Sequence, residues 1–590
     1  MNTLKSKSAM PLITDWSQID WQKINRYVEK LQQRIYHAER AGDKRKVRNL
    51  QRMLMNSEAA LLASIRRVTQ LNKGKRTAGV DGYKALTPKD RLELFQKMRN
   101  MSLSLHKPKP AYRTYIKKKN GKLRPLGIPT ITDRVYQNVV RLALEPQWEA
   151  EFEPTSYGFR PKRNCHDAIE RIFNTMKGST KREWVFEGDF KGCFDTLNHD
   201  FIIRQLEGFP ESELIAKWLK AGFVDNKVFN ETDEGTPQGG IISPLLANIA
   251  LHGMEQVLGI KYTLVHHGEK TTYENHTPYM MCRYADDFVI MCKTKQEAEQ
   301  LYKTLEEYLS CRGLALAEEK TKITHVSNGF DFLGFNVRKY DTQNGAKLLI
   351  KPSKDSIRKF KNTVAGIVRG LYGNNVQSMI NRLNPVIIGT ANYWCRKVAK
   401  ETFSAMDNYV WGRIYRYLRR THPKKGWKWI KRQYFKPDKT GQSMDKWILT
   451  DPVTGNQLKK MAWTPIVRHQ QIKYNYSPFD ADLEEYFDKR DRNEFDLNNV
   501  AYRQKLAKKQ KYVCPMCGMS ITDFEEGLET HHILPVVKGG TGTYKNLQLV
   551  HISCHIEYHR VFPAKGDVPT PSEIAKCHKG IKGKRLAGTL

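Results

Sequence analysis

Apolar residues recur at steps of three and four residues in the first part of the chain, which is the spacing of one helix face. From Trp21 to Gln70 these positions include Ile24, Leu31 and Ile35, so the segment is predicted to be helical. Glycines then interrupt the pattern, and a second amphipathic helix is predicted over residues 88–101.

Short apolar runs in the middle of the chain predict buried strands. One run spans Trp184–Phe190, a second spans Met280–Met291 and a third spans Phe330–Val337. The segment Arg113–Pro129 is predicted to be a β-hairpin that turns at Asn120-Gly121, because this dipeptide favours tight hairpin turns. We therefore expect the middle of the chain to mix strands with helices.

Helical periodicity returns over residues 354–417, whereas residues 440–500 are predicted to be rich in loops. A last unit begins near Tyr502. The final 80 residues contain four of the ten cysteines, and three of these have the spacing of a metal site. Ten cysteines in such a long chain are too few for a disulfide framework, which is typical of a reduced compartment.

The charge balance points to a polyanionic partner. The 590 residues carry 99 Lys and Arg against 62 Asp and Glu, a formal net charge of +37. Lys and Arg neutralise phosphates, so nucleic acid is the expected partner, and a basic surface that serves only solubility is the alternative. No apolar run approaches the roughly 18 residues of a membrane helix. Met1–Met10 lacks the apolar segment of a secretory signal. We expect no membrane partner, and a bacterial cytoplasm near the nucleoid, or an organelle, as the location.

Positive charge gathers in particular segments. Residues 411–440 contain eleven Lys and Arg and a single acid, interleaved with seven aromatic residues, and residues 501–511 add five Lys and Arg and no acid. Interleaved rings and cations suit a surface that stacks on bases and neutralises phosphates. Two simpler interpretations remain open, namely that about half of these aromatics are helix core and that the basic face of residues 21–70 is merely solvated.

Three acids stand among apolar residues, where burial of a charge is costly without a cation. Asp286 and Asp287 are adjacent within one apolar run, and Asp189 ends another. Carboxylates from neighbouring strands hold two Mg²⁺ ions in enzymes that join nucleotides through an in-line displacement. A lone Asp-Asp pair is more often a turn or a helix cap, so the surrounding segments decide the interpretation.

Those segments resemble the palm of reverse transcriptases, whose Tyr-x-Asp-Asp box matches Tyr284–Asp287. The resemblance implies that the three acids are the catalytic metal ligands and that dNTPs are the substrates. It also implies that Phe194 is a steric gate against ribonucleotides and that Gln238 contacts the incoming nucleotide. Lys122 and Arg124 would be the two basic residues that hold the triphosphate.

Two further motifs resemble the group II intron-encoded proteins. They are Gly235-Thr-Pro-Gln-Gly-Gly240 and Ser156-Tyr-Gly-Phe-Arg-Pro161. In that family the helical region after the palm is the thumb, or maturase domain, which binds intron RNA and assists splicing. Residues 353–435 fit that role in helicity and charge.

The C-terminal cysteines form a knuckle pattern. Cys514 and Cys517 are separated by two residues, and His551 and Cys554 repeat this spacing. Two such pairs supply four ligands to one tetrahedral Zn²⁺. The first pair alone is also compatible with a redox motif.

The residues between and after these pairs resemble the HNH endonucleases, whose ββα-metal core carries one divalent ion. The resemblance implies that His532 is the general base, that Asn546 orients the catalytic loop and that His531 and His555 bind the ion. His559 lies one helical turn beyond His555 and is a further candidate ligand.

The alternative is that these histidines are zinc ligands or core residues. The family usually has Cys where this chain has His551, so the fourth zinc ligand stays open. Cys577 and His578, in the basic tail, are less favoured competitors because Cys577 has no partner at knuckle spacing.

The expected fold is a multidomain α+β protein: a right-hand polymerase with an antiparallel sheet, an α-helical thumb, a loop-rich DNA-binding region and a small zinc-stabilised ββα-metal nuclease. The expected boundaries are 1–105 for the N-terminal helical extension and start of the fingers, and 106–350 for the fingers and palm. Residues 351–440 are expected to form the thumb, 441–505 the DNA-binding region, 506–565 the nuclease and 566–590 a basic tail.

The leading functional hypothesis is a retroelement enzyme that binds group II intron RNA, assists its splicing, nicks target DNA and copies the intron from the new 3′ end. One alternative is an RNA-binding splicing cofactor with a vestigial polymerase, although three converging acids have no use in such a protein. Another is a defence-associated reverse transcriptase without an intron.

Overall fold

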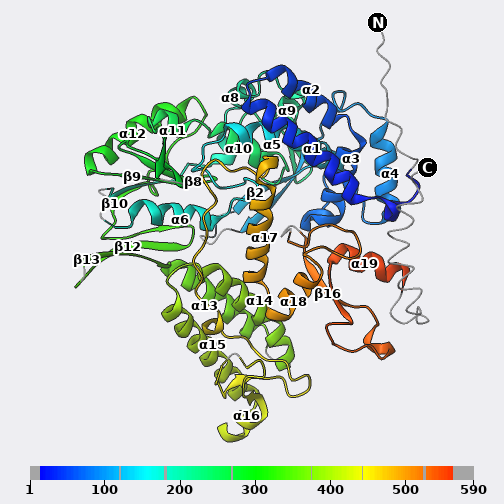
Figure 1. Cartoon of the computed structure of the whole chain (residues 1–590), viewed down its shortest axis with the longest axis vertical. Coiled ribbons are helices and arrows are strands. Elements are labelled where there is room, and N and C mark those ends of the chain that lie inside the picture. Colours follow the sequence, from blue (N-terminus) through cyan, green and yellow to red (C-terminus); the bar gives the residue numbers. More distant parts are fainter. Residues whose placement is uncertain are drawn as a thin grey trace.

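Four helices build the N-terminal region of the computed structural model (Figure 1). The structure describes residues 13–562 except 118–120, 122, 179–181, 268–269, 344, 372, 374, 442 and 523–525. The predicted helical segment 21–70 divides at Gly42, which has a φ of +74°, and the second predicted helix is present. These helices are α1 (Trp21–Arg40), α2 (Lys44–Met55), α3 (Glu58–Arg66) and α4 (Pro88–Arg99).

The first three of these helices pack against α5 (Ile131–Glu151), the long helix that follows the fingers hairpin. The hairpin itself consists of β1 (Ala111–Lys117) and β2 (Leu123–Ile128), which pair in antiparallel fashion with Lys117 opposite Leu123. Asn120 of the predicted turn lies outside the described residues. Two short strands complete this sheet in the order β2-β1-β4-β5, namely β4 (Phe223–Asp225) and β5 (Val228–Asn230).

A four-stranded antiparallel sheet lies in the segment predicted to be the palm, in the order β10-β3-β9-β8. The names fingers, palm and thumb are kept below for the predicted segments. Successive side chains of a strand point to opposite faces, so Phe186 joins one hydrophobic core and Val185 the other. Helix α12 (Lys295–Ser310) packs against β3, β9 and β10, and α6 (Cys165–Met176) packs against β8. The strands are β3 (Trp184–Gly188), β8 (Met280–Tyr284), β9 (Asp287–Cys292) and β10 (Lys322–His325).

Smaller elements complete the palm. The predicted strand 330–337 breaks at Leu333 and Gly334, both with positive φ, into a hairpin that belongs to a three-stranded sheet. That sheet contains β11 (Phe330–Phe332), β12 (Phe335–Thr342) and β13 (Gly345–Pro352). The remaining elements are β6 (Thr263–His267), β7 (Lys270–Glu274), α7 (Cys193–Thr196), α8 (His199–Gln205), α9 (Ser212–Leu219), α10 (Ser243–Ala250) and α11 (Met254–Val257).

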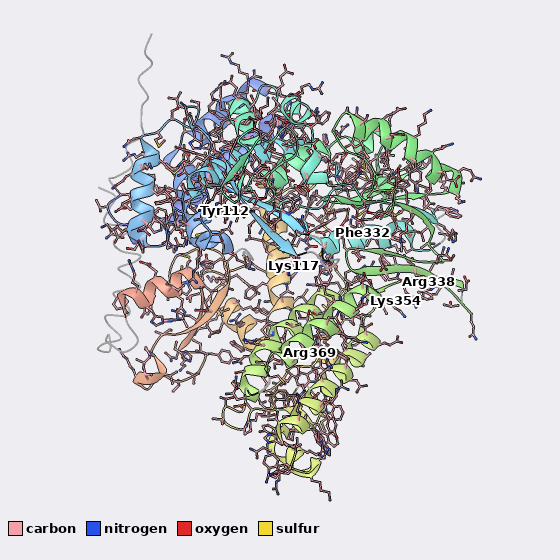
Figure 2. All side chains as sticks on the ribbon, turned by 180° about the vertical axis from the view of Figure 1, so that it is seen from behind. Tyr112, Lys117, Phe332, Arg338, Lys354 and Arg369 are labelled. Carbon is pink, nitrogen blue, oxygen red and sulfur yellow. The ribbon has the colours of Figure 1, made fainter. Side chains whose placement is uncertain are left out.

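The thumb projects from the palm as a group of helices (Figure 1). Figure 2 shows Lys354 and Arg369 at the two ends of its first helix, with Tyr112 and Lys117 on β1 in the fingers above. In the basic-aromatic stretch, Tyr417 and Phe435 are buried, while Trp411, Tyr415 and Trp427 pack on one another. The elements of this segment are α13 (Lys354–Arg369), α14 (Val376–Trp394), α15 (Lys400–Thr421), α16 (Trp427–Tyr434) and β14 (Phe435–Lys436). Strand β14 pairs with β15 (Ile448–Leu449) of the segment predicted to bind DNA.

The segment predicted to be rich in loops contains a 15-residue helix, α17 (Glu484–Asn498), and this helix lies against the palm rather than apart from it. The last unit begins with α18 (Ala501–Lys509) and has the ββα order expected for it. Its elements are β16 (Leu528–His532), β17 (Leu547–His551) and α19 (Ile552–Val561). The basic tail 566–590, with Cys577 and His578, lies outside the described residues.

Two large hydrophobic cores cover the two faces of the palm sheet, and a third, small one supports the C-terminal unit. No helix in the described part of the chain is long and apolar enough to cross a membrane.

Candidate metal centres

The three predicted acids lie at one edge of the palm sheet. Strand β3 pairs with β9, with Gly188 opposite Phe288, and β9 pairs with β8 through a turn at Ala285-Asp286. Asp189 follows Gly188, and Asp287 precedes Phe288, so their carboxylates leave the sheet at the same end of adjacent strands. Gly188 is required there because a Cβ atom would lie 2.0 Å from the Phe288 ring.

A second segment supports the turn that carries Asp286. Ala285 has a φ of +59°, a region that L residues rarely adopt. The Ser156–Arg160 segment runs alongside, where the Tyr157 N–H donates to the Arg283 carbonyl at 2.9 Å. A Cβ atom on Gly158 would lie 2.2 Å from the Ala285 nitrogen. The motif predicted from sequence therefore contains glycine because the two backbones touch behind the acidic turn.

A buried arginine holds these two segments together. Arg283 is fully buried, donates to the Asn248 side chain at 3.2 Å and lies 3.7 Å from a Glu153 carboxylate oxygen. The Asn248 amide in turn donates to the Gly158 carbonyl at 2.8 Å. Sequence reasoning missed this network. The available signal was a charged residue inside an otherwise apolar strand, which must be paired when buried.

The acidic edge carries excess negative charge. Desolvation, with the charges of Asp286 and Asp189 beside it, raises the pKa of Asp287 to about 6. The Lys320 ammonium lies 2.8 Å from the Asp189 carboxylate and partly offsets that charge. Carboxylate oxygens are the donors that suit Mg²⁺, although the three acids are not among the described groups whose ligand atoms all lie within 4.8 Å of one another. Lys320 was not singled out in the sequence, where it is one of many lysines.

Two of the residues predicted to contact the nucleotide, Arg124 and Gln238, form a chain of side-chain contacts with Asp195. Arg124 on β2 donates to the Gln238 side-chain oxygen at 2.6 Å, and the Gln238 amide donates to Asp195 at 3.1 Å. Phe194 precedes Asp195 on α7. Its side chain is 9% exposed, and its ring contacts the ring of Phe159 edge-on. Lys122 lies outside the described residues.

Two glycines of the Gly235–Gly240 motif permit this approach. Gly235 and Gly239 have positive φ values, and a Cβ atom on either would lie 2.6 Å from a backbone oxygen, that of Asp195 or Gly127. The loop is thus pressed against both α7 and β2.

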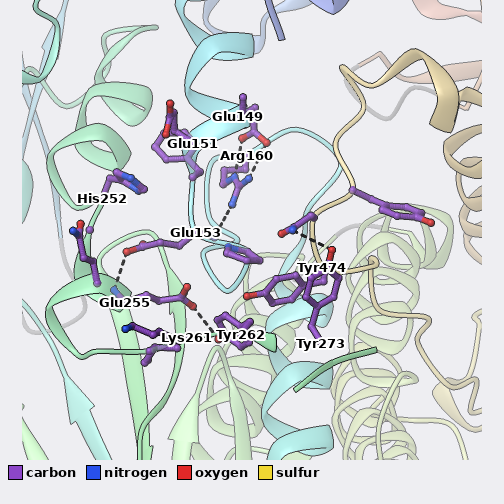
Figure 3. A pocket seen from close by; sticks show the side chains of 18 of the residues that line it. Glu149, Glu151, Glu153, Arg160, His252, Glu255, Lys261, Tyr262, Tyr273 and Tyr474 are labelled. Atoms are coloured by element: carbon purple, nitrogen blue, oxygen red, sulfur yellow. Dashed lines mark hydrogen bonds and ion pairs between the residues drawn. The ribbon is translucent and has the colours of Figure 1, made fainter. Parts of the chain in front are cut away.

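A separate cavity of about 590 Å³ lies next to the network of Arg283 (Figure 3). Glu153 and Glu255 line it, and burial with the charge of Glu153 raises the pKa of Glu255 to about 7. Tyr262, Tyr273 and Tyr474 gather on one side in Figure 3. None of the three predicted acids lines this cavity, so it is not the carboxylate site.

The four predicted zinc ligands converge. One ligand atom each from Cys514, Cys517, His551 and Cys554 lies within 4.8 Å of the others. His551 Nδ1 is 3.3 Å from the Cys517 sulfur, while its Nε2 is 3.0 Å from the Ser520 carbonyl oxygen. Because a carbonyl accepts only from a protonated Nε2, Nδ1 is left as the metal-facing donor. Three sulfurs and one imidazole nitrogen fit Zn²⁺.

A second histidine group lies between β16 and α19. His531, His555 and His559 place one nitrogen each within 4.8 Å of one another, and the facing nitrogens of His555 and His559 are 3.0 Å apart. The Nδ1 of His555 is hydrogen-bonded to Glu529, which orients the other nitrogen toward the group. Glu529 was not predicted, although it precedes the His pair by two residues on the same strand. Three imidazoles fit one divalent ion.

The two remaining predicted residues lie at the loop 533–546. Asn546 accepts from the Leu534 N–H at 2.7 Å and donates to the carbonyls of Leu534 and Thr541 at 3.0 and 2.8 Å, so it ties the loop ends together. His532 is partly buried at the end of β16 and alternates with His531 along that strand. It is not part of the three-histidine group.

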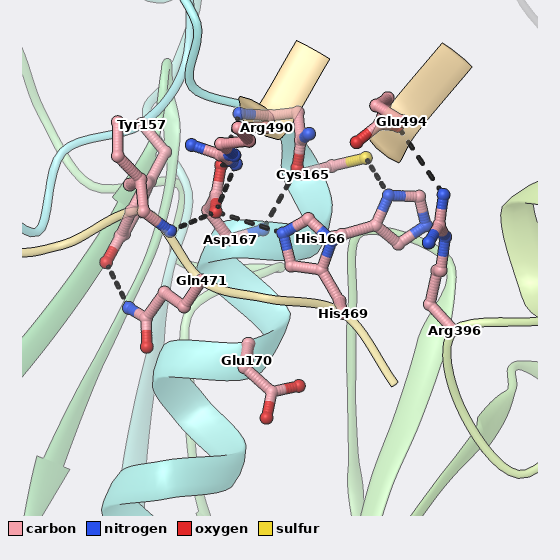
Figure 4. Close-up of polar contacts among 12 residues, drawn as sticks. Tyr157, Cys165, His166, Asp167, Glu170, Arg396, His469, Gln471, Arg490 and Glu494 are labelled. Atoms are coloured by element: carbon pink, nitrogen blue, oxygen red, sulfur yellow. Dashed lines mark hydrogen bonds and ion pairs between the residues drawn. The ribbon is translucent and has the colours of Figure 1, made fainter. Parts of the chain in front are cut away.

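A buried ion-pair cluster joins the palm to the thumb and to α17 (Figure 4). Asp167 on α6 accepts two hydrogen bonds from Arg490, at 2.8 and 2.9 Å, one from the Ile472 N–H at 2.8 Å, and contacts His469 at 3.0 Å. Burial works to raise the pKa of Asp167, but His469 and Arg490 outweigh it and lower the pKa to about 2. His166 beside it is hydrogen-bonded to the Tyr393 carbonyl at 2.8 Å.

Comparison with protein families matches four consecutive parts of the chain. The models are "N-terminal domain of reverse transcriptase" for residues 16–98, "Reverse transcriptase (RNA-dependent DNA polymerase)" for 116–337, "Group II intron, maturase-specific domain" for 357–435 and "HNH endonuclease" for 514–560.

Curated relatives match about half of the chain. The chain is 36% identical to Protein YkfC of Escherichia coli (strain K12), over 54% of this chain and 91% of that protein. It is 35% identical to the Group II intron-encoded protein LtrA of Lactococcus lactis subsp. cremoris, over 49% of this chain and 59% of LtrA. A telomerase structure from Candida albicans aligns with 12% identity over 53% of this chain and 60% of that chain, at a TM-score of 0.32.

Proposed function

Because the chain belongs to the group II intron-encoded reverse transcriptase/maturase family and has a C-terminal HNH endonuclease domain, we propose that it carries out target-primed reverse transcription of its own intron. It would bind the intron RNA, assist its splicing, nick a DNA target and extend the new 3′ end. The observation that carries this proposal is the presence on one chain of a three-carboxylate edge and a ββα unit with three converging histidines.

For the polymerase we propose that Asp189, Asp286 and Asp287 hold two Mg²⁺ ions. When bound, these ions would activate the primer hydroxyl and stabilise the leaving pyrophosphate. The neighbouring residues would bind the incoming dNTP. Arg124 and Lys122 would contact its triphosphate, Gln238 would position the nucleotide, and Phe194 would occupy the space that a 2′-hydroxyl needs. The contact of Arg124 with Gln238 supports a shared role.

For the nuclease we propose that His532 takes the proton of the attacking water. His531, His555 and His559 would hold one divalent ion, which when bound stabilises the leaving oxygen. Asn546 would keep the loop in place through its three hydrogen bonds. The group of Cys514, Cys517, His551 and Cys554 would hold a structural Zn²⁺ that supplies no chemistry.

For RNA binding we propose the basic faces of the N-terminal helices and of the thumb. The expected divisions at residues 105, 350, 440 and 505 remain our proposal for the domains. The partners would be intron RNA, target DNA and dNTPs, in a bacterial cytoplasm near the nucleoid or in an organelle.

Asp286→Ala and His532→Ala test the two centres against each other. We expect Asp286→Ala to abolish primer extension and to leave RNA binding, splicing assistance and DNA nicking intact. We expect His532→Ala to stop nicking and to leave extension of a pre-nicked primer intact. Glu306→Ala, which removes an exposed carboxylate from α12, is the matched control for the acidic variant.

Two results would contradict the proposal. If nicking persists in His532→Ala, the assignment of the base is wrong. If Asp286→Ala loses extension, RNA binding and splicing together, the variant has misfolded, and the division into separate functional units fails.

A further inference from the structure

The loop 533–546 of the C-terminal unit presents two adjacent apolar side chains to solvent. Val536 and Val537 form the start of a short 3₁₀ turn and are 62% and 76% exposed. An isolated exposed apolar residue is ordinary, but two consecutive ones on a small unit mark a contact surface more often.

The tip of the loop is held in one conformation. The N–H groups of Lys538 and Gly540 donate to the Pro535 carbonyl at 2.9 and 3.1 Å. Gly540 approaches so closely that a Cβ atom would lie 1.9 Å from the Leu534 carbonyl oxygen. Valine is also stiff at χ1, so these side chains lose little freedom when they insert into a partner.

The segment that carries the two valines is basic, and Lys538 follows them directly. Residues 530–556 contain no Asp or Glu. Exposed Lys545 adjoins Tyr544, whose carbonyl accepts from Lys509 at 3.0 Å and whose ring lies 5.8 Å from the Lys505 ammonium. A small unit that presents an apolar tip and several lysines, here called the basic rim (Lys505, Lys509, Lys538 and Lys545), complements a partner that has apolar surface between phosphates. Duplex DNA has both.

The loop 533–546 lies next to the residues proposed to cleave DNA. It begins directly after His532, the last residue of β16, and Asn546 closes it at the start of β17. A tip placed there would act on the same stretch of DNA that the three-histidine group faces.

We propose that Val536 and Val537 form a wedge that enters the minor groove of duplex DNA, partly unstacks a base step and bends the duplex so that a phosphodiester reaches His532. This inference rests on the proposed nuclease function. Unstacking costs a few kcal/mol for each step, and contacts of the basic rim with phosphates would offset it.

The test uses duplexes tiled across the DNA that flanks the gene, labelled with 2-aminopurine, whose fluorescence rises on unstacking. The wild-type chain, without divalent ions, is expected to raise the fluorescence at one step, and Val536→Ser/Val537→Ser is expected to lose that rise. Ile556→Ser, at a residue 61% exposed on α19 of the same unit, is the matched control and should behave as wild type.

Nicking supplies the second readout. The double variant should nick intact duplex at least about tenfold more slowly, and a mismatch at the labelled step, which removes most of the unstacking cost, should restore its rate. Extension of a pre-nicked primer should not change.

Unchanged fluorescence with wild-type protein, or equal loss on intact and mismatched duplexes, would overturn the wedge. So would a change in oligomeric state of the double variant by light scattering, because the valines would then contact a second copy. If wild type unstacks DNA but never nicks it, the nuclease proposal fails and the wedge stands.

Discussion

The two candidate centres are built by different means. The carboxylates of the palm stand at the ends of strands β3 and β9, between two large hydrophobic cores. The histidines of the C-terminal unit rest on a small core, which has nine buried residues in the part of the chain that the structure describes, and Cys514 and Cys517 are two of the nine. A small unit buries too little apolar surface to be stable alone, and metals commonly supply the difference. The hydrophobic cores therefore stabilise the palm, whereas we expect the C-terminal unit to need a metal bound by its Cys/His group.

The C-terminal unit also packs against the N-terminal helices. The sulfur of Met519 accepts from Arg66 at 3.3 Å and from Asn25 at 3.7 Å, and Arg66 lies over the Trp21 ring at 4.6 Å. This contact sets where the Cys/His group of the C-terminal unit lies relative to the polymerase region. Met519 packs against the small core from outside and is only partly buried, so we do not expect it to replace a bound metal.

Removal of zinc should produce the largest difference between nicking by the C-terminal unit and primer extension by the palm. Metal analysis is expected to find about one tightly held Zn²⁺ per chain and none in Cys514→Ser/Cys517→Ser, because a structural zinc contributes on the order of 10–16 kcal/mol. Nicking should fall by at least about 1,000-fold, whereas primer extension should persist. Cys311→Ser, at an exposed thiol, is the control. Equal loss of both activities would show that the palm also depends on the metal.

The corresponding weak point of the palm is an ion pair rather than a metal. Arg490→Met leaves Asp167 buried without its main cation, and we expect a loss of about 3–5 kcal/mol in the free energy of unfolding, followed by denaturation and primer extension. Arg492→Met, which removes an exposed pair with Asp488 on the same helix, should cost less than about 1 kcal/mol. If Arg490→Met and Arg492→Met lower the free energy of unfolding by similar amounts, the Asp167–Arg490 ion pair is not the weak point of the palm.

The stability that comes from the buried cluster around His166 and Asp167 should be sensitive to acid. Burial lowers the pKa of His166 from its ordinary 6.5 to about 4, so between these values the unfolded chain binds a proton that the folded chain does not. The stability is fully present above pH 6.5 and is lost as the pH falls toward 4, by at most about 3 kcal/mol. His166→Gln should flatten the pH dependence of the unfolding free energy, and His276→Gln, at an exposed ring, should not.

The smallest effect concerns the nuclease ion. Glu529→Gln removes the carboxylate that orients His555, and outer-shell partners of this kind typically contribute about 10–100-fold in metal affinity. A titration of nicking with divalent ion should shift by that amount and recover at saturation, with zinc content unchanged. Glu557→Gln, paired only at the surface with Arg560, is the control. A rate that never recovers would indicate a role in the chemistry itself.

Sequence reasoning was strongest where the chemistry lies in a short segment. The Tyr284–Asp287 turn, the Cys514–Cys517 knuckle and the ββα order of the last unit were all predicted, because each is a local pattern of residue types. It was weaker where neighbours are distant in sequence. The break of the strand 330–337 was missed, because a positive φ at Leu333 has no signal in the pattern of apolar residues. The helix α17 was missed because it is mostly polar and shows no clear helical spacing of apolar residues.

The sequence by itself determined the candidate ligands, their order and the family. The tertiary structure alone decided that Lys320 offsets Asp189, that Arg283 stands behind the acidic turn, that Glu529 orients His555 and that Arg490 joins α17 to the palm. The reason is physical. A charged side chain looks the same in sequence whether it is solvated or buried, and only burial against a particular partner gives it a structural role.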